Sequence, residues 1–123
     1  MRGIILSGVI TLSITALSSA QGSVQIIDTT PYTKDIYGYK GPVPIKLHLQ
    51  DGIIQKVELL PNLESPHRVK FIIEDGLLER WRGVKADDAQ SVKIDATAGA
   101  TLTTDAIVEN VNIAAKKALQ PHD

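Results

Sequence analysis

The sequence predicts a small single-domain α+β fold that contains an antiparallel β-hairpin sheet, two short helices and a longer C-terminal helix. Apolar and polar residues alternate from Val43 to Gln50, as in a strand with one buried face. A helical period replaces this alternation between Ser65 and Gly83. The longest helical pattern runs from Thr103 to Leu119. The chain has 123 residues, which is enough for one domain and too few for two.

The hairpin has the clearest signals of these elements. Asp51 and Gly52 follow the alternating strand and form a two-residue turn, in which both central positions favour positive φ. The return strand is predicted over 53–60, where Pro61 ends it. The short apolar run Val24 to Ile27 indicates a lead-in segment or an edge strand.

Other segments carry weaker signals. Residues 35–42 are rich in Tyr and Gly and predict a strand that enters a tight turn. In the region 65–83, Asp75-Gly76 separates two short helices. Residues 91–95 alternate and predict another short strand. In the C-terminal helix, one of the threonines 103 and 104 is expected to cap the start.

Composition excludes several classes of function. The formal net charge is −1, so no basic field is present to attract nucleic acid. The chain has no cysteine, which removes thiol nucleophiles, iron–sulfur clusters and thiolate zinc sites. The three histidines, His48, His67 and His122, lack metal-ligand spacing and are predicted to lie on the surface. We therefore expect no metal site, no acid–base catalytic set and no nucleic-acid partner.

The first twenty residues have the pattern of a signal peptide. Arg2 precedes the apolar stretch Ile4 to Leu17, and Ser18-Ser19-Ala20 places small side chains before Gln21. The apolar stretch is shorter than the roughly twenty residues that a membrane-spanning helix needs. We predict a cleaved signal peptide over 1–20 and a lead-in segment over 21–36, with an uncleaved N-terminal anchor as the alternative. Both place the domain outside the cytoplasm, in the periplasm or on the outer face of the membrane.

A turn of small residues joins the predicted strand that ends at Asp95 to the C-terminal helix. The first backbone N–H groups of a helix lack intrahelical partners, and the helix dipole adds positive potential there. Gly99 and its alanine neighbours allow a bulky ligand to approach, and hydroxyls crowd the same point at Thr101, Thr103 and Thr104. The pattern indicates a site for a phosphate-like anion. The alternative is that the threonines only cap the helix.

The pattern Asp-x-x-x-Gly-Ala-Thr-x-Thr over 95–103 resembles the flavinylation motif of the FMN-binding domain family. That family includes the C subunit of sodium-pumping NADH:quinone reductases and the G subunit of Rnf complexes. The resemblance implies that an FMN transferase, using FAD, joins the phosphate of FMN to the hydroxyl of Thr101. Asp95 matches the leading acid of the motif, which implies a contact with the transferase and its metal ion. Gly99, Ala100 and Thr103 match the remaining positions, and Ala98 stands where Ser is most common.

The resemblance covers roughly residues 37–119, the extent of the predicted FMN-binding domain. Its further points of agreement are Gly38-Tyr39, Asp51-Gly52, Glu64-Ser65-Pro66 and the run Arg80 to Gly83, whereas His67 stands where the family often has Gly. The isoalloxazine ring of a flavin needs an apolar or aromatic wall and a few donors, and we expect Glu64-Ser65-Pro66, Leu102 and the segment with Tyr37 and Tyr39 to supply them.

The function implied is that of an electron-transfer module with covalent FMN, rather than a stand-alone enzyme. Its expected partners are the transferase and membrane-associated or exported redox proteins. The alternative is a docking or regulatory module in which FMN is bound non-covalently or absent.

Overall fold

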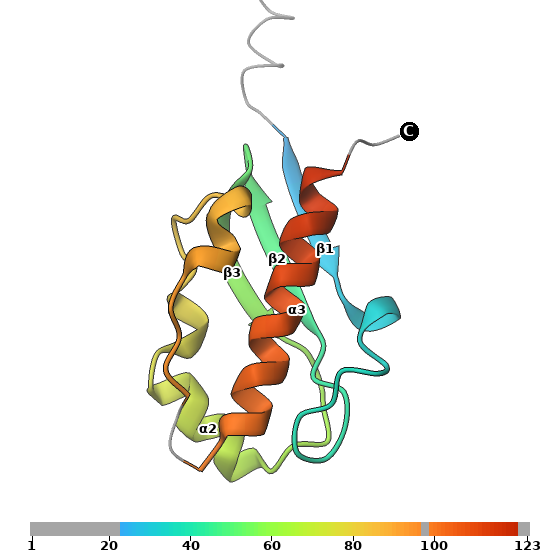
Figure 1. Ribbon diagram of the computed structural model, residues 1–123, viewed down its shortest axis with the longest axis vertical. Coiled ribbons are helices and arrows are strands. Elements are labelled where there is room, and N and C mark those ends of the chain that lie inside the picture. Colours follow the sequence, from blue (N-terminus) through green and yellow to red (C-terminus); the bar gives the residue numbers. More distant parts are fainter. Residues whose placement is uncertain (1–22, 97–98, 121–123) are drawn as a thin grey trace, which may run out of the picture.

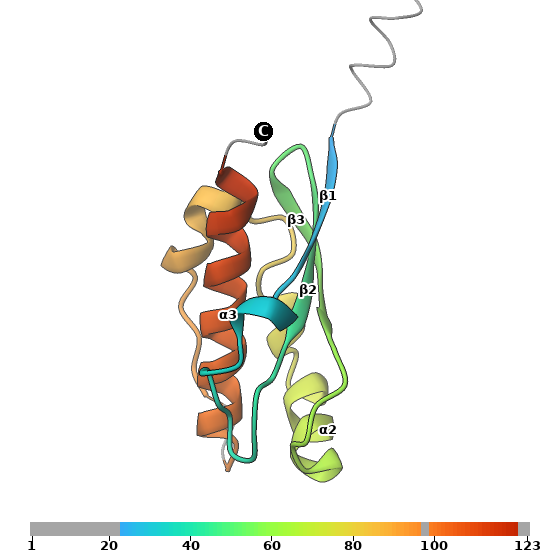
Figure 2. The same cartoon turned by 90° about the vertical axis from the view of Figure 1, so that its right-hand side faces the viewer.

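The computed structural model describes residues 23–96 and 99–120 and confirms the α+β fold. Three antiparallel strands form a sheet in the order β1-β2-β3: Val24–Asp28, Ile45–Gln50 and Ile53–Leu59. The long helix α3 (Thr101–Leu119) lies across one face of this sheet (Figures 1 and 2). The shorter helix α2 (Pro66–Glu74) lies at the end of the sheet away from the β2–β3 turn (Figure 1). In the described part of the chain, no helix combines the length and apolar character needed to cross a membrane.

The hairpin prediction is confirmed in detail. Asp51 and Gly52 have φ values of 54° and 78°, so both central turn positions are left-handed, as the sequence pattern requires. The alternating side chains of β2 are buried at Ile45, Leu47 and Leu49. β1 pairs antiparallel with β2, which confirms that the run from Val24 is an edge strand.

Two predicted strands are absent from the structure. Residues 35–42 form a turn with a single isolated bridge between Tyr37 and Pro42, because the Gly38 N–H donates to the Gly41 carbonyl across 2.9 Å. Residues 91–95 pair with no strand in the described part of the chain. They follow the 3₁₀ helix η3 (Ala86–Ser91), while the residue that pairs with Ile53 beside β3 is Lys85.

The alternation over 91–95 has another physical cause. Val92 and Ile94 are half-buried against the hydrophobic core, whereas their neighbours are exposed. One-sided packing of an extended segment gives the same period of two as strand pairing, so the sequence pattern could not separate the two.

The helical predictions need one correction. Between 65 and 83 the structure has α2 and the 3₁₀ helix η2 (Leu77–Glu79), as expected. However, α3 begins at Thr101, two residues earlier than predicted, and its N-cap is Ala100, which provides no side-chain cap. The prediction that Thr103 or Thr104 caps the helix is therefore wrong. Both side chains are buried inside the first turn.

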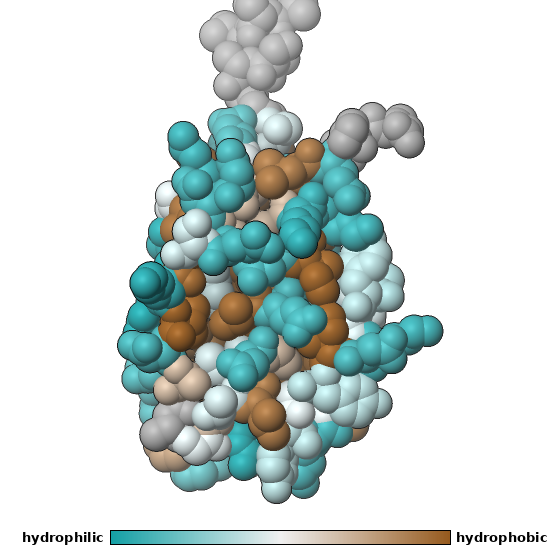
Figure 3. Space-filling view, in the orientation of Figure 1, coloured by the Kyte–Doolittle hydropathy of each residue, from teal (hydrophilic) through white to brown (hydrophobic). Residues whose placement is uncertain are grey.

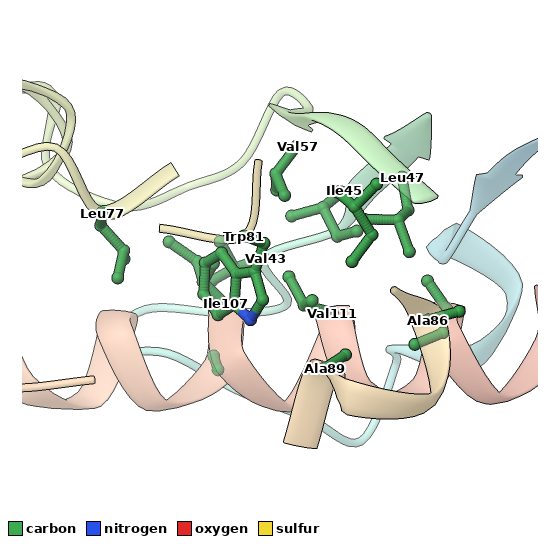
Figure 4. Close-up of a cluster of buried hydrophobic side chains, with 14 of the residues drawn as sticks. Val43, Ile45, Leu47, Val57, Leu77, Trp81, Ala86, Ala89, Ile107 and Val111 are labelled. Carbon is green, nitrogen blue, oxygen red and sulfur yellow. The ribbon is translucent and has the colours of Figure 1, made fainter. Parts of the chain in front are cut away.

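The hydrophobic core fills the space between the sheet and α3. Trp81, which is 1% exposed, packs beside Val43 and Ile107 (Figure 4). The remaining core residues are all aliphatic: Ile45, Leu47, Leu49, Ile54, Val57, Ile72, Leu77, Ala86, Ala89, Ala100, Ala106, Val111, Ala114 and Ala115. On the surface drawn in Figure 3, hydrophobic side chains form separate groups among hydrophilic ones. The core thus fixes α3 on the sheet and so fixes the position of its first turn.

Candidate functional site

Three segments that are distant in sequence meet at one end of the molecule. They are the turn 38–41, the start of α2 and the start of α3, and this end is opposite to the β2–β3 turn (Figures 1 and 2). A hydrogen bond from Thr103 to Glu64 and another from Arg68 to Gly99 join the segments. Most of the residues that the sequence singles out lie at this end.

Glu64 is the buried centre of the site. Its carboxylate Oε1 accepts hydrogen bonds from the Thr103 hydroxyl and, at 2.7 Å, from the Tyr39 N–H. Its Oε2 accepts a hydrogen bond from the Lys40 N–H at 2.6 Å. The side chain is only 4% exposed. We call this arrangement of Glu64, Thr103 and the backbone of 39–40 the Glu64 latch, because it ties the turn 38–41 to the first turn of α3.

Asn62 and Gly38 border the Glu64 latch and restrict the position of its carboxylate. Asn62 accepts the Glu64 N–H at 3.0 Å and donates to the Leu60 carbonyl at 2.8 Å, which fixes the approach to the carboxylate. A Cβ at Gly38 would overlap Oε1 of Glu64, so any residue other than glycine would force the carboxylate or its neighbours to move.

The ionised form of Glu64 is the favoured one. Burial by itself raises the pKa of Glu64, but the hydrogen bonds from the Thr103 hydroxyl and from three backbone N–H groups outweigh it. The pKa of Glu64 therefore lies below its ordinary value. The carboxylate also lies beside the N-terminal turn of α3, where the helix dipole favours negative charge.

Arg68 lies on the outer side of the same end. Its Nε donates to the Gly99 carbonyl at 3.1 Å, and its guanidinium lies over the Tyr39 ring, 4.5 Å from the centroid. Gly99 has a φ of 79°, a left-handed conformation that a residue with Cβ adopts at a cost. Arg68 thus connects α2 both to the turn before α3 and to the turn 38–41.

Two hollows flank Arg68. The Thr101 hollow has a volume of about 240 Å³ and is lined by Tyr39, Arg68 and residues 99–103. The Phe71 hollow has a volume of about 140 Å³ and is lined by Ser65, His67, Arg68, Phe71, Gly99 and Ala100. The His67 and Phe71 rings meet edge to face with centroids 4.6 Å apart. Aromatic and apolar walls with one cation and a hydroxyl are suited to a planar ligand that carries an anion.

The three threonines of the α3 turn have different environments. Thr101 is exposed and lines the Thr101 hollow. Thr103 is fully buried and its hydroxyl is engaged by Glu64. Thr104 is 1% exposed, and its hydroxyl has no hydrogen-bond partner among the described residues. Of the three hydroxyls, the one that is open to a second molecule is that of Thr101.

The N-termini of both helices lack side-chain caps. The N-cap residues are Ser65 for α2 and Ala100 for α3, and neither side chain makes a capping hydrogen bond. The first N–H groups of each helix therefore have no such partner at the end where the hollows lie. The interpretation that the threonines serve only as helix caps is not supported by this geometry.

Most of the predicted site residues lie at this end of the molecule, but they do not all line the same hollow. Leu102 is 54% exposed and lines the Thr101 hollow, whereas Ser65 lines the Phe71 hollow. Glu64 lies beneath the hollows rather than in their walls. Asp95 is exposed and lines neither of these hollows. Thr97 and Ala98 lie outside the described residues.

The sequence reasoning missed Arg68, and it placed His67 only as a surface histidine. The available signal was the position of Arg68 in the first turn of the helix that follows Glu64-Ser65. A cation is disfavoured at that end of a helix, so its presence there suggests a specific partner. Of the other histidines, His48 lies 3.0 Å from Glu58 on the sheet, and His122 is outside the described residues.

Comparison with known proteins identifies a family whose matched range contains this site. The family model of the FMN-binding domain matches residues 38–116, a range that includes the turn 38–41, Glu64, Arg68 and Thr101. A search of curated proteins finds no match.

Proposed function

The chain belongs to the FMN-binding domain family, and on this basis we propose that it is an exported electron carrier that holds FMN covalently through Thr101. FMN is the cofactor that the family indicates. When bound, the flavin supplies the redox chemistry, and the protein contributes binding, orientation and electrostatics. The covalent bond, the export and the electron-transfer role are the parts that we propose.

The observation that carries the proposal is the contrast in exposure between the threonines. Flavinylation requires that an enzyme reach the acceptor hydroxyl, and Thr101 is exposed, whereas Thr103 and Thr104 are buried. In the proposed reaction, a transferase breaks the pyrophosphate bond of FAD, and Thr101 Oγ forms a bond to the phosphorus of the FMN half. AMP leaves, and the hydroxyl loses its proton.

The residues around Thr101 fit the group that they would hold. The phosphodiester would carry one negative charge beside the uncapped N-terminus of α3 and the Arg68 guanidinium. Tyr39 and Leu102, which are 59% and 54% exposed, provide apolar surface in the same hollow. The hollows are open to solvent, which suits a cofactor that exchanges electrons with another protein.

The position of the N-terminal side suits a carrier that is held at a membrane through residues 1–20. Ser23, the first described residue, lies beside the β2–β3 turn, where its carbonyl accepts the Asp51 N–H at 2.9 Å. That turn is at the end of the molecule opposite to the start of α3, where Thr101 is the first residue (Figure 1). A domain held at a membrane through residues 1–20 would therefore keep Thr101 at the end remote from its attachment, accessible to a redox partner.

Intact-mass measurement tests the proposal. The full chain, co-expressed with an FMN transferase in an exporting host, is expected to gain the mass of one FMN minus one water and to keep its flavin absorbance after denaturation. Thr101→Ser should retain attachment, because it keeps the hydroxyl, and Thr101→Ala should abolish it. The same spectrum reports whether residues 1–20 are removed.

Two outcomes would contradict the covalent model. Flavin that is released on denaturation, with an unmodified protein mass, would instead support the non-covalent docking module. Full attachment in Thr101→Ala would show that another hydroxyl is the acceptor.

A further inference from the structure

Arg68 carries a charge that the described residues do not neutralise. It forms no ion pair among them, and the polar partner of its guanidinium is the uncharged carbonyl of Gly99. Glu64 is close in sequence, but its carboxylate is buried and its oxygens accept hydrogen bonds from Tyr39, Lys40 and Thr103. The cation therefore faces the hollows without a protein anion.

The location of Arg68 is unfavourable for the isolated protein. It is the third residue of α2, in the first helical turn, where the dipole disfavours positive charge. The start of α3 adds a second uncapped N-terminus at the same end. A positively charged side chain between two helix N-termini becomes favourable when an anion binds there.

The contacts of Arg68 fix its orientation. The Tyr39 ring lies against the guanidinium, and the Gly99 carbonyl holds Nε. The guanidinium has five N–H donors, and apart from the bond from Nε to the Gly99 carbonyl it makes no hydrogen bond to the described residues. Arg68 and Thr101 line the same hollow, so an anion bound to the Thr101 side chain would lie in the hollow that Arg68 borders.

We propose that Arg68 is the positioning residue that receives the phosphodiester anion of FMN attached at Thr101. The inference rests on the proposed function and adds a specific residue to it. It also predicts that the site selects a flavin that carries a phosphate. A planar guanidinium can donate to two phosphate oxygens at once through its fixed fork of N–H groups, which the single ammonium of a lysine does not match.

The test compares two variants that remove the same charge from the full chain. Arg68→Gln removes the guanidinium between the hollows, and Arg80→Gln removes an exposed arginine that lines neither of them. With a purified FMN transferase and FAD, we expect loading of Arg68→Gln to be slower by about tenfold, which is the effect of losing one charge-assisted hydrogen bond. Arg80→Gln should load at the wild-type rate, and Arg68→Lys should lie between.

A second measurement on the loaded proteins separates positioning of the phosphate from docking of the transferase. The ³¹P resonance of the phosphodiester should shift in Arg68→Gln and stay at the wild-type position in Arg80→Gln. Equal loading rates, or an unchanged ³¹P resonance in Arg68→Gln, would overturn the inference while leaving covalent attachment intact. A wild-type protein that never loads would overturn the proposed function, and this inference with it.

Discussion

In the Glu64 latch, a buried carboxylate receives hydrogen bonds from the protein itself, whereas the arginine and the exposed hydroxyl of the Thr101 hollow have no anionic partner among the described residues. Both regions use the first turn of α3. Thr101 and Thr103 are two residues apart, and such residues point to different sides of a helix. One turn therefore presents a hydroxyl outward to the hollow and another inward to the latch.

The difference separates two roles within the Thr-x-Thr pattern. The inner threonine donates its hydroxyl to Glu64 and holds the turn in place, and the outer one is exposed in the Thr101 hollow. The latch resembles a completed polar network, in which each oxygen of the carboxylate has a donor. The Thr101 hollow instead combines a cation, a hydroxyl and apolar walls that are open to a second molecule.

The largest effect is expected for Gly38→Ala. The added Cβ would lie 2.4 Å from Glu64 Oε1 and 2.9 Å from Val43, so the latch or the core must shift. We expect a loss of about 3 kcal/mol in the free energy of unfolding, measured by urea denaturation. Gly41→Ala is the control in the same turn, because its Cβ would meet only the flexible Leu63 side chain, at 3.6 Å. Equal losses in the two variants would show that the Glu64 carboxylate has room to move away from the added Cβ.

A smaller effect should distinguish the two buried threonines. Thr103→Val keeps the shape of the side chain but removes the hydrogen bond to the Glu64 carboxylate, with an expected loss of about 2 kcal/mol. Thr104→Val removes a buried hydroxyl that has no partner among the described residues, so stability should stay equal or rise. Thermal unfolding of both variants measures the difference. A Thr104→Val variant that is as unstable as Thr103→Val would contradict the distinct roles of the two side chains.

The sequence predicts the local segments of this structure better than the contacts between segments that are distant in sequence. The β2–β3 hairpin followed from local chemistry, because Asp51 and Gly52 suit the turn and Ile45, Leu47 and Leu49 alternate. Thr101, Gly99 and Ala100 could be identified from the motif, since the residues of a motif are adjacent in sequence. The sequence therefore predicted the segment that carries the proposed chemistry.

The contacts that support the segment could not be predicted in the same way. Glu64 meets Thr103 across 39 positions, and Arg68 meets Gly99 across 31. Such pairs depend on how α2 and α3 pack, and no local period records that packing. The strand predicted over 91–95 was wrong for a related reason, because alternation reports which side is buried and not whether a neighbouring strand exists.

The smallest effect concerns pH and uses the Thr103→Val variant again. The folded pKa of Glu64 lies below its ordinary value of 4.5, so at acidic pH the unfolded chain binds more protons than the folded one. The stabilisation is complete above pH 4.5 and is lost as the pH falls through the lowered folded pKa. In Thr103→Val, one of the donors that lower this pKa is missing, so less stability should be lost on acidification.

The stability gap between wild type and Thr103→Val should therefore narrow by about 1 kcal/mol on moving from neutral pH to well below pH 4.5. Urea denaturation of both proteins across this range measures the gap. Two other carboxyl groups also have a lowered pKa. Hydrogen bonds from Thr30 lower the pKa of Asp28, and the hydrogen bond with His48 lowers that of Glu58. Both groups affect the stability of the two proteins equally. They cancel in the comparison, so a gap that stays constant with pH would mean that Thr103 stabilises the fold without favouring the ionised Glu64. The latch would then be a packing contact, and its contrast with the charged hollow would lose its electrostatic basis.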